Sequence, residues 1–398
     1  MPVDAAYVYR AGTRAARLVR ERDGVHFRYL PEYLASHALP VATTLPLRTA
    51  DVVTTGGAVP AFFAGLLPEG RRLGLLRREV KASADDELSL LAAVGSDTVG
   101  DVQVIPDGSS PTAAEPAVEI DLRGDLDFSS LVGELAPVDR VGLAGVQDKV
   151  SGRMICVPAR DARKRYILKL NPPEYPHVVE NEAFFLDASR ACRLPTVESR
   201  LLTDRHGVHA LLVTRFDRLA SESQTTSLAV EDGCQVLDRW PADKYSVTTA
   251  QVFITLSSLC AARDVAARDL FRQLCFALLT GNGDLHAKNV SIVTDPVTGE
   301  WRIAPAYDLP STAFYGDRSL ALTLEGRRSG ISRRILLDFA ESIGLRRPGA
   351  SRWLDDILVR TPDLAERIEA GALPFSRDVA HKAARVLRNN RRLLAEGR

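Results

Sequence analysis

The sequence lacks the features of a disulfide-bonded or zinc-stabilised protein. It has only five cysteines, an odd number, and none of them form a C-x-x-C pair. The seven histidines are scattered too widely along the chain to indicate a metal cluster. Secreted disulfide frameworks and zinc ribbons show regular cysteine spacings instead. We therefore expect a reduced, cytosolic protein without a structural zinc site.

The chain also lacks a long apolar segment and an excess of charge of either sign. No apolar run approaches the length that spans a bilayer, and the N-terminus has no signal-peptide core. The 51 basic and 51 acidic side chains cancel to a net charge of zero. Bulk electrostatics therefore give no reason to expect a membrane or a nucleic acid as the main ligand.

Lysine is scarce, since only seven of the 51 basic residues are lysine and the others are arginine. Three of the seven, Lys149, Lys169 and Lys288, lie within the motifs described below. The lysine ammonium is a compact point charge, whereas the arginine guanidinium is a wide planar fork. The two side chains therefore differ at a tight phosphate site.

The chain is long enough for two or three domains. Short strands and helices are expected over residues 1 to about 105, and the Pro- and Ser-containing stretch 106–116 is typical of a linker. From Thr248 onward the chain is predicted to be mainly helical. Leu270, Leu274 and Leu278 recur on one helix face, and Gly281 is expected to end that helix.

The segment 281–292 carries the strongest functional signal. Asp284 and Asn289 stand five residues apart, the spacing of a kinase catalytic loop. In such a loop the Asp accepts a hydrogen bond from the attacking hydroxyl, and the Asn binds magnesium. Asp308 follows a predicted strand, where the second magnesium ligand belongs. The alternative is that both aspartates cap turns, but the ordered set favours phosphoryl transfer.

Lys169 lies in the predicted strand 166–170, and a kinase needs such a lysine facing the ATP phosphates. Glu182 is its candidate partner, because it shares a predicted helix face with Val178 and Phe185 and should point inward. The alternatives are a strand-edge lysine that blocks aggregation and a solvated helix glutamate. The loop Gly145-x-Gln147-x-Lys149 could cradle phosphates with its backbone amides, although such a motif alone is often only a turn.

Seven motifs in order resemble those of the HipA family of serine/threonine kinases, the toxins of HipA–HipB toxin–antitoxin systems. They read G-V-Q-D-K, Y-I-L-K-L, E-N-E, R-F-D-R, E-D-G-C-Q, N-G-D-L-H-A-K-N and A-Y-D-L. The segments 62–69 and 95–100 are similar to the N-terminal subdomain of that family. The resemblance covers residues 60–325 at least.

The resemblance implies an α+β, bilobal, protein-kinase-like fold. It comprises an N-terminal α/β subdomain and linker over residues 1–115, a region with the phosphate loop and ATP lysine over 116–235, and a helical C-terminal lobe over 236–398. Asp284 would be the catalytic base, and Asn289 and Asp308 would hold Mg²⁺. The expected ATP-binding residues are Ala144, Gly145, Val146, Gln147, Asp148, Lys149, Lys169, Arg215, Phe216, His286, Lys288 and Tyr307. Glu231, Asp232 and Gln235 match a family motif to which we assign no role.

The resemblance also implies partners. We expect a protein substrate, with an aminoacyl-tRNA synthetase as the family precedent, and a HipB-like helix-turn-helix antitoxin. Operator DNA would be contacted only weakly or indirectly. The last helix is locally basic. A basic helix face is usually exposed to solvent, although in a HipA-like complex this one could lie near antitoxin or DNA. Its basic residues are Arg377, Lys382, Arg385, Arg388, Arg391, Arg392 and Arg398.

Two positions depart from the family pattern. Thr214 stands before R-F-D-R, where the family often has Glu, and Gly142 stands where the family has the serine that it autophosphorylates. In that family, phosphorylation of the loop serine switches the kinase off. Gly142 has no hydroxyl, and Ser151 is the only hydroxyl between Arg140 and Arg153. We therefore expect no self-phosphorylation in this loop, and restraint by a partner instead.

Two other functions fit parts of the sequence. G-D-L-H-x-x-N also resembles aminoglycoside and choline phosphotransferases, which act on small molecules but lack the segment 62–69 and the G-x-Q-x-K loop. A degenerate kinase could instead act as a scaffold or co-repressor with a DNA-binding antitoxin. The intact set Lys169, Asp284, Asn289 and Asp308 argues against degeneracy.

Overall fold

The chain divides into two compact units, which are not contiguous in sequence. The computed structural model describes residues 3–36, 38–83, 85–111, 118–122, 124–128, 130, 155–161, 164–221 and 225–396. The first unit comprises Met1–Pro116, Asp217–Lys244 and Val293–Gly299, and the second comprises Ala117–Phe216, Tyr245–Ile292 and Glu300–Arg398. Both contain helices and strands, which confirms the α+β class.

These units group the chain differently from the three expected segments. The end of the first stretch, Pro116, nearly coincides with the expected boundary at residue 115, but Asp217–Lys244 joins the first unit. The division into 1–115, 116–235 and 236–398 stays a prediction. The sequence also predicts a helix over residues 129–136, of which the structure describes only residue 130.

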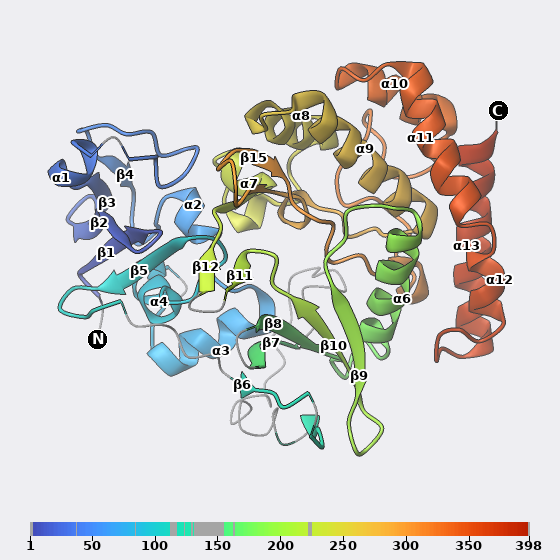
Figure 1. Cartoon of the computed structure of the whole chain (residues 1–398), viewed down its shortest axis with the longest axis horizontal. Coiled ribbons are helices and arrows are strands. Elements are labelled where there is room, and N and C mark those ends of the chain that lie inside the picture. Colours follow the sequence, from blue (N-terminus) through green and yellow to red (C-terminus); the bar gives the residue numbers. More distant parts are fainter. Residues whose placement is uncertain are drawn as a thin grey trace. The chain divides into compact units, whose positions relative to one another are not determined.

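The first unit is built on an antiparallel sheet in the order β4-β3-β2-β1-β5 (Figure 1). Alternate side chains of its strands, such as Ala6 and Val8, are buried, as expected for a sheet with one face on a core. Phe27, Phe63 and Leu91 pack into the same core. The strands are β1 (Ala5–Arg10), β2 (Thr13–Glu21), β3 (Gly24–Tyr29), β4 (Val52–Thr54) and β5 (Val102–Pro106).

The sequence predicts a helical stretch around 60–76, and the structure has two helices there. Helix α2 ends at Ala64, Pro68 follows, and α3 begins at Gly70. Proline disfavours helical backbone in the residue before it and cannot donate an intrahelical hydrogen bond, which explains the break. The helices of this unit are α1 (Pro31–Leu34), α2 (Ala61–Ala64), α3 (Gly70–Val80), α4 (Glu87–Val94), α7 (Gly233–Val236) and the 3₁₀ turn η2 (Pro241–Asp243); its remaining strands are β11 (Arg218–Ala220), β12 (Thr225–Ser227) and β13 (Val230–Asp232).

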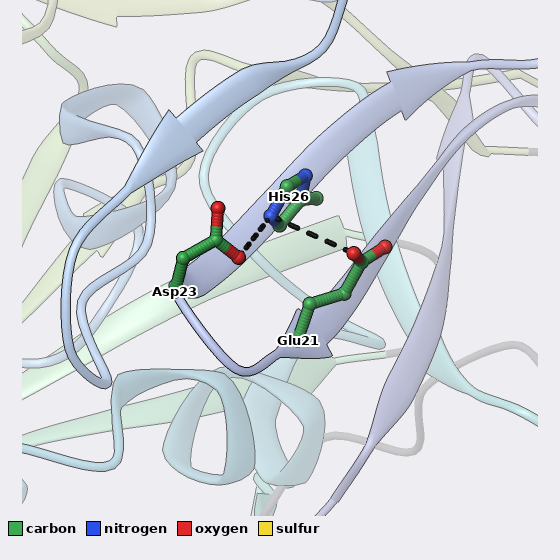
Figure 2. A group of neighbouring side chains, drawn as sticks. All are labelled: Glu21, Asp23 and His26. Carbon is green, nitrogen blue, oxygen red and sulfur yellow. Dashed lines mark hydrogen bonds and ion pairs between the residues drawn. The ribbon is translucent and has the colours of Figure 1, made fainter.

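The β2–β3 hairpin carries a charged cluster around His26 (Figure 2). The Nε2 atom of His26 lies 2.8 Å from Asp23 Oδ1, and its Nδ1 atom lies 3.1 Å from Asp51 Oδ2. The hydrogen bonds with Asp23 and Asp51 raise the pKa of His26 above its ordinary value. Glu21, Asp23 and His26 have ligand atoms within 4.8 Å of one another, so this group could also hold a metal ion. The spacing of the histidines does not reveal this group, because its other two members are carboxylates. The expectation of no structural zinc site stays a prediction.

The E-D-G-C-Q segment is part of the structural framework of the first unit. Thr43 donates from its backbone N and its Oγ1 to the Glu231 carboxylate, at 2.8 and 2.6 Å. Gln235 donates from Nε2 to the Phe62 carbonyl at 2.9 Å, and Asp232 caps α7 in a capping box with Gln235. These contacts join β13 and α7 to segments that lie far earlier in the sequence.

Glu231 is almost completely buried. Burial raises its pKa to about 7, although the hydrogen bonds from Thr43 lower it. A carboxyl group whose pKa is higher in the folded than in the unfolded chain favours folding in its protonated form. Its contribution is therefore lost as the pH rises from the unfolded pKa of about 4.5 through the folded pKa of about 7.

We predict that Glu231→Gln changes the pH dependence of stability. The amide mimics the neutral acid and still pairs with Thr43. The variant should gain up to about 3 kcal/mol of unfolding free energy over the wild type between pH 5 and pH 8. Urea unfolding across this range measures the difference. Glu79→Gln, at an exposed position of the same unit, is the control and should give a pH-independent difference.

The second unit contains a five-stranded sheet in the order β6-β7-β8-β10-β9, in which only β6 and β7 pair in parallel. Helix α6 packs against β9 and β10 (Figure 1). The bounds are β6 (Val118–Glu119), β7 (Ile155–Asp161), β8 (Lys164–Leu170), α6 (Val178–Ala191), β9 (Ser199–Thr203) and β10 (His209–Thr214).

The rest of the second unit is mainly helical. Thr248 begins α8 with a capping box, and α9 ends where Gly281 takes the left-handed conformation at φ 68°, which glycine adopts without strain. The elements are α8 (Thr249–Leu259), α9 (Arg263–Thr280), η3 (Ala287–Asn289), β15 (Trp301–Ile303), η4 (Thr312–Tyr315), α10 (Arg333–Ser342), α11 (Arg347–Arg360), α12 (Leu364–Glu369) and α13 (Arg377–Ala395); strand β14 (Ser291–Thr294) spans the boundary at residue 292. Among the described residues, no helix has both the length and the apolar character needed to cross a membrane.

Candidate active site

The predicted site residues that the structure describes all belong to the second unit. The loop residues Ala144, Gly145, Val146, Gln147, Asp148 and Lys149 lie outside the described residues, as do Gly142 and Ser151. Their expected roles stay predictions. The remaining residues come from β8, α6, the end of β10, the loop after α9 and the segment after β15.

Lys169 is at the centre of a buried ion-pair cluster. Its Nζ lies 2.8 and 2.9 Å from the two carboxylate oxygens of Glu182 and 3.1 Å from Asp308 Oδ1. Glu182 is fully buried on α6, and Lys169 is 9% exposed on β8. One ammonium group thus joins a strand, a helix and the segment that follows β15.

The cluster places one ammonium group between two carboxyl groups, and burial raises the pKa of Glu182. Burial opposes the charge on Lys169, but the carboxylates of Asp308 and Glu182 outweigh it and raise the pKa of the ammonium. Lys169 is therefore protonated, and it lies between these two carboxyl groups. Such a site favours the approach of an additional cation.

Three successive residues of α6 make contacts in three directions. Glu180 accepts hydrogen bonds from Asn171 and His209, each at 2.9 Å, which ties the helix to the sheet. Asn181 donates to the Ser311 carbonyl at 3.0 Å and accepts from the Ser311 amide at 2.9 Å. Glu182 binds Lys169. The E-N-E motif therefore connects the sheet, the lysine and the segment 308–311.

Asp308 has an uncommon backbone conformation. Its φ is 56°, in the left-handed region that aspartate tolerates better than most residues. Its backbone amide donates to Glu182, and its carboxylate accepts from Lys169. Contacts on both sides of the residue hold this conformation in place.

The loop after α9 is organised by its own amides. Asn282 Oδ1 accepts from the Asp284 amide, and the Asp284 carbonyl accepts from Asn289 Nδ2, both at 2.8 Å. Asp284 is fully buried, with Tyr245 Oη 3.5 Å and His286 Nε2 3.9 Å from its Oδ1. The five-residue spacing thus closes a small ring between Asp284 and Asn289.

Asn289 and Asp308 fit a magnesium ion by the chemistry of their donor atoms. The Nδ2 of Asn289 is used in the bond to Asp284, which leaves its Oδ1 as the acceptor for another group. Asp308 supplies a carboxylate beside the buried Lys169–Glu182 pair. Oxygen ligands of this kind, few in number, are those that magnesium uses together with substrate phosphates.

Phe216 and Tyr307 form an aromatic pair, and Tyr307 directly precedes Asp308. Their rings stack with centroids 5.7 Å apart and an angle of 24° between planes. Tyr307 donates from its hydroxyl to the Lys288 carbonyl at 2.9 Å, and Arg215 donates from its backbone to the Arg165 carbonyl at 3.0 Å. An aromatic surface beside a phosphate site is suited to a planar base.

Sequence reasoning missed two residues that position the site. Asn181 was read only as a letter of the E-N-E motif, although it fixes the segment after Asp308. Thr312 accepts from the Gly283 amide at 3.0 Å and donates to the Gly281 carbonyl at 3.2 Å, which holds the loop that leads into Asp284. The motif order could have indicated Asn181, whereas no local pattern indicates Thr312.

We predict that Glu182→Ala destabilises the fold. The change leaves the buried ammonium of Lys169 with one partner instead of two. Removing one member of a buried ion pair should lower the unfolding free energy by on the order of 3 kcal/mol. Denaturant unfolding measures it. Glu198→Ala, at an exposed position of the same unit, should have an effect within about 0.5 kcal/mol; an equally small loss for Glu182→Ala would contradict the buried-pair interpretation.

Two family models match the chain. The HipA-like C-terminal domain matches residues 141–365, and the HipA N-terminal domain matches residues 6–105. The putative kinase Y4mE of Sinorhizobium fredii is 28% identical over 92% of each chain. The serine/threonine-protein kinase toxin HipA of Shewanella oneidensis is 26% identical over 89% of this chain and 88% of the toxin.

The fold has a solved counterpart. A chain from the Shewanella oneidensis toxin–antitoxin complex of HipA, HipB and operator DNA matches with a TM-score of 0.75 at 22% identity, over 98% of this chain and 97% of that chain. At this identity the likeness establishes the shared fold.

The fold and the cluster around Lys169 define an α+β protein with the polar residues typical of a kinase. With both of its domain models matched, the chain belongs to the HipA family, the serine/threonine kinase toxin family. Relatives named as kinases support phosphotransferase activity.

Proposed function

We propose that this protein is a serine/threonine protein kinase that transfers the γ-phosphate of ATP to a hydroxyl of a protein target. The observation that carries the proposal is the ion-pair cluster of Lys169, Glu182 and Asp308, in the same unit as Asp284 and Asn289. An inactive scaffold has no need to retain a buried ion-pair cluster, because taking its charged groups out of water is costly.

Each of these residues has a role that follows from its contacts. Lys169, held by Glu182, presents a positive charge to the ATP phosphates. Asp284 accepts the proton of the target hydroxyl, and Thr312 and Asn282 fix the loop that carries it. Because Asp284 is fully buried, the target hydroxyl reaches it only after neighbouring side chains move.

Asn289 and Asp308 would hold magnesium through their oxygen atoms. When bound, the ion would supply positive charge that offsets the negative charge of the phosphates during transfer. Phe216 and Tyr307 would take the adenine ring against their stacked pair. Arg215, His286 and Lys288 complete the proposed nucleotide contacts, together with the loop 144–149.

The identities of the protein target and of the partner that restrains the kinase are inferred from the family. A relative of this fold was solved in complex with HipB and operator DNA, which supports a HipB-like antitoxin as partner here. An aminoacyl-tRNA synthetase is the expected target. Phosphoproteomics after induced expression, with the Asp284→Asn variant as the matched control, identifies the phosphorylated protein.

We predict that Asp284→Asn retains nucleotide binding and loses phosphoryl transfer. The amide keeps the size of the side chain but cannot accept the proton of the hydroxyl. The rate of transfer should fall by about 10²- to 10⁴-fold. Radiolabel transfer from ATP to the identified target measures the rate. A variant with wild-type transfer would remove Asp284 from the proposed role.

We also predict that nucleotide binding requires magnesium, Lys169 and Asp308. Lys169→Ala should weaken the binding of a non-hydrolysable ATP analogue, because the buried positive charge that faces the phosphates is lost. Calorimetric titration with and without magnesium measures the affinity. Lys164→Ala removes an exposed lysine from the same strand and should leave the affinity unchanged. Unaltered affinity in a folded Lys169→Ala variant would place the nucleotide elsewhere.

A further inference from the structure

The second unit contains a cavity of about 470 Å³ beside the start of the candidate catalytic loop. It is lined by the end of α9 with residues 281–283, by the segment 318–331, and by residues 385–394 of α13. Gly283 directly precedes Asp284, so the wall of the cavity and the proposed base share the same stretch of backbone. None of the roles proposed above uses this cavity.

The lining is cationic. It includes Arg318, Arg328 and Arg385, and no acidic side chain is among the described residues that line it. Arg328 donates to the carbonyls of Leu320, Ala321 and Tyr245. The side chains of Arg318 and Arg385, both exposed, make neither a hydrogen bond nor an ion pair within the parts of the chain that the structure describes. Asp317 Oδ2 lies beside Gly283, so one carboxylate adjoins a lining that carries three arginines.

The other basic residues along the same face and flanks of α13 are mostly paired. Lys382 binds Asp378 at 2.6 Å, Arg388 binds Glu366 and Glu369, and Arg392 binds Glu396. Arg385, like the exposed Arg377 at the start of the helix, has no such side-chain partner among the described residues, but Arg385 lines the cavity. Its guanidinium group is therefore available to an anionic ligand there.

Amides and apolar side chains make up the rest of the lining. Asn282 is 1% exposed, and its Nδ2 has no hydrogen-bond partner among the described residues. A buried donor without an acceptor is unfavourable, so this amide is available to a ligand that reaches it. Leu320, Ile331 and Leu393 supply apolar surface. A cavity of this size with a few polar groups on apolar walls suits a small molecule.

We infer that this cavity binds a small phosphorylated molecule that regulates the kinase. A guanidinium group matches a phosphate with two parallel hydrogen bonds, and two unpaired guanidinium groups face the cavity. A duplex nucleic acid fits less well, because the lining is concave and largely apolar. A ligand held here contacts residues 281–283 and so changes the placement of Asp284. The regulatory part rests on the proposed function, whereas the binding part does not.

Calorimetric titration of the full-length protein with pyrophosphate tests the binding. A saturating non-hydrolysable ATP analogue with magnesium is present, so that the nucleotide site is filled. We expect one pyrophosphate per chain. Arg318→Ala and Arg385→Ala should each weaken binding by about tenfold or more, as expected for a lost hydrogen bond to a charged group. Arg385→Lys, which keeps the charge without the fork, should fall between wild type and Arg385→Ala.

The matched control is Arg377→Ala, an exposed arginine at the start of the same helix and outside the cavity. It should leave pyrophosphate binding unchanged. An equal loss in this variant, or wild-type affinity in the double variant of Arg318 and Arg385, would overturn the site. Loss of duplex DNA binding instead, in the same two variants, would assign the arginines to nucleic acid.

The regulatory part has its own measurement. Pyrophosphate should change the rate of phosphoryl transfer by threefold or more in the wild type and not in Arg385→Ala. An unchanged rate at a concentration that saturates the cavity would overturn regulation and leave the binding site in place. If the protein transfers no phosphate at all, the proposed function fails, and the arginine-dependent binding of pyrophosphate still decides the site.

Discussion

The arrangement of the candidate site in the second unit depends on the ammonium group of Lys169. It offsets the repulsion between the carboxylates of Glu182 and Asp308, which would otherwise be forced together in a buried site. Taking such charges out of water is expensive, and the cost is repaid only when every partner is in place. The left-handed backbone of Asp308 persists for the same reason, since both its amide and its carboxylate are held.

Features encoded by short-range spacing could be predicted from the sequence. Asp284 and Asn289 close their ring because five residues separate them, and Gly281 ends α9 because glycine alone takes that backbone without strain. The break between α2 and α3 also follows from a local rule, because Pro68 lies between the two helices.

Contacts between distant segments could not be predicted in the same way. Nothing in the local sequence of Thr43 or Thr312 indicates that one binds Glu231 and the other fixes the Gly281–Asp284 loop. Threonine and asparagine accept and donate in many settings, so their partners are set by the tertiary fold. The cluster at His26 could not be predicted for a related reason. The fold brings carboxylates from separate positions in the sequence to one imidazole.

The discontinuity of the first unit has a consequence for synthesis on the ribosome. Thr43 and Glu231 are separated by 188 positions, and Phe62 and Gln235 by 173. An emerging N-terminal region therefore waits for most of the second unit's sheet to be translated before these bonds can form. Closing loops of this length is slow. The chain loses conformational entropy when the two ends meet, before the stabilising contacts between them have formed. During that interval the core around Phe62 and Phe63 is not yet covered by the segment that carries Glu231 and Gln235. Apolar surface is then exposed, and a chaperone would bind the chain at this stage.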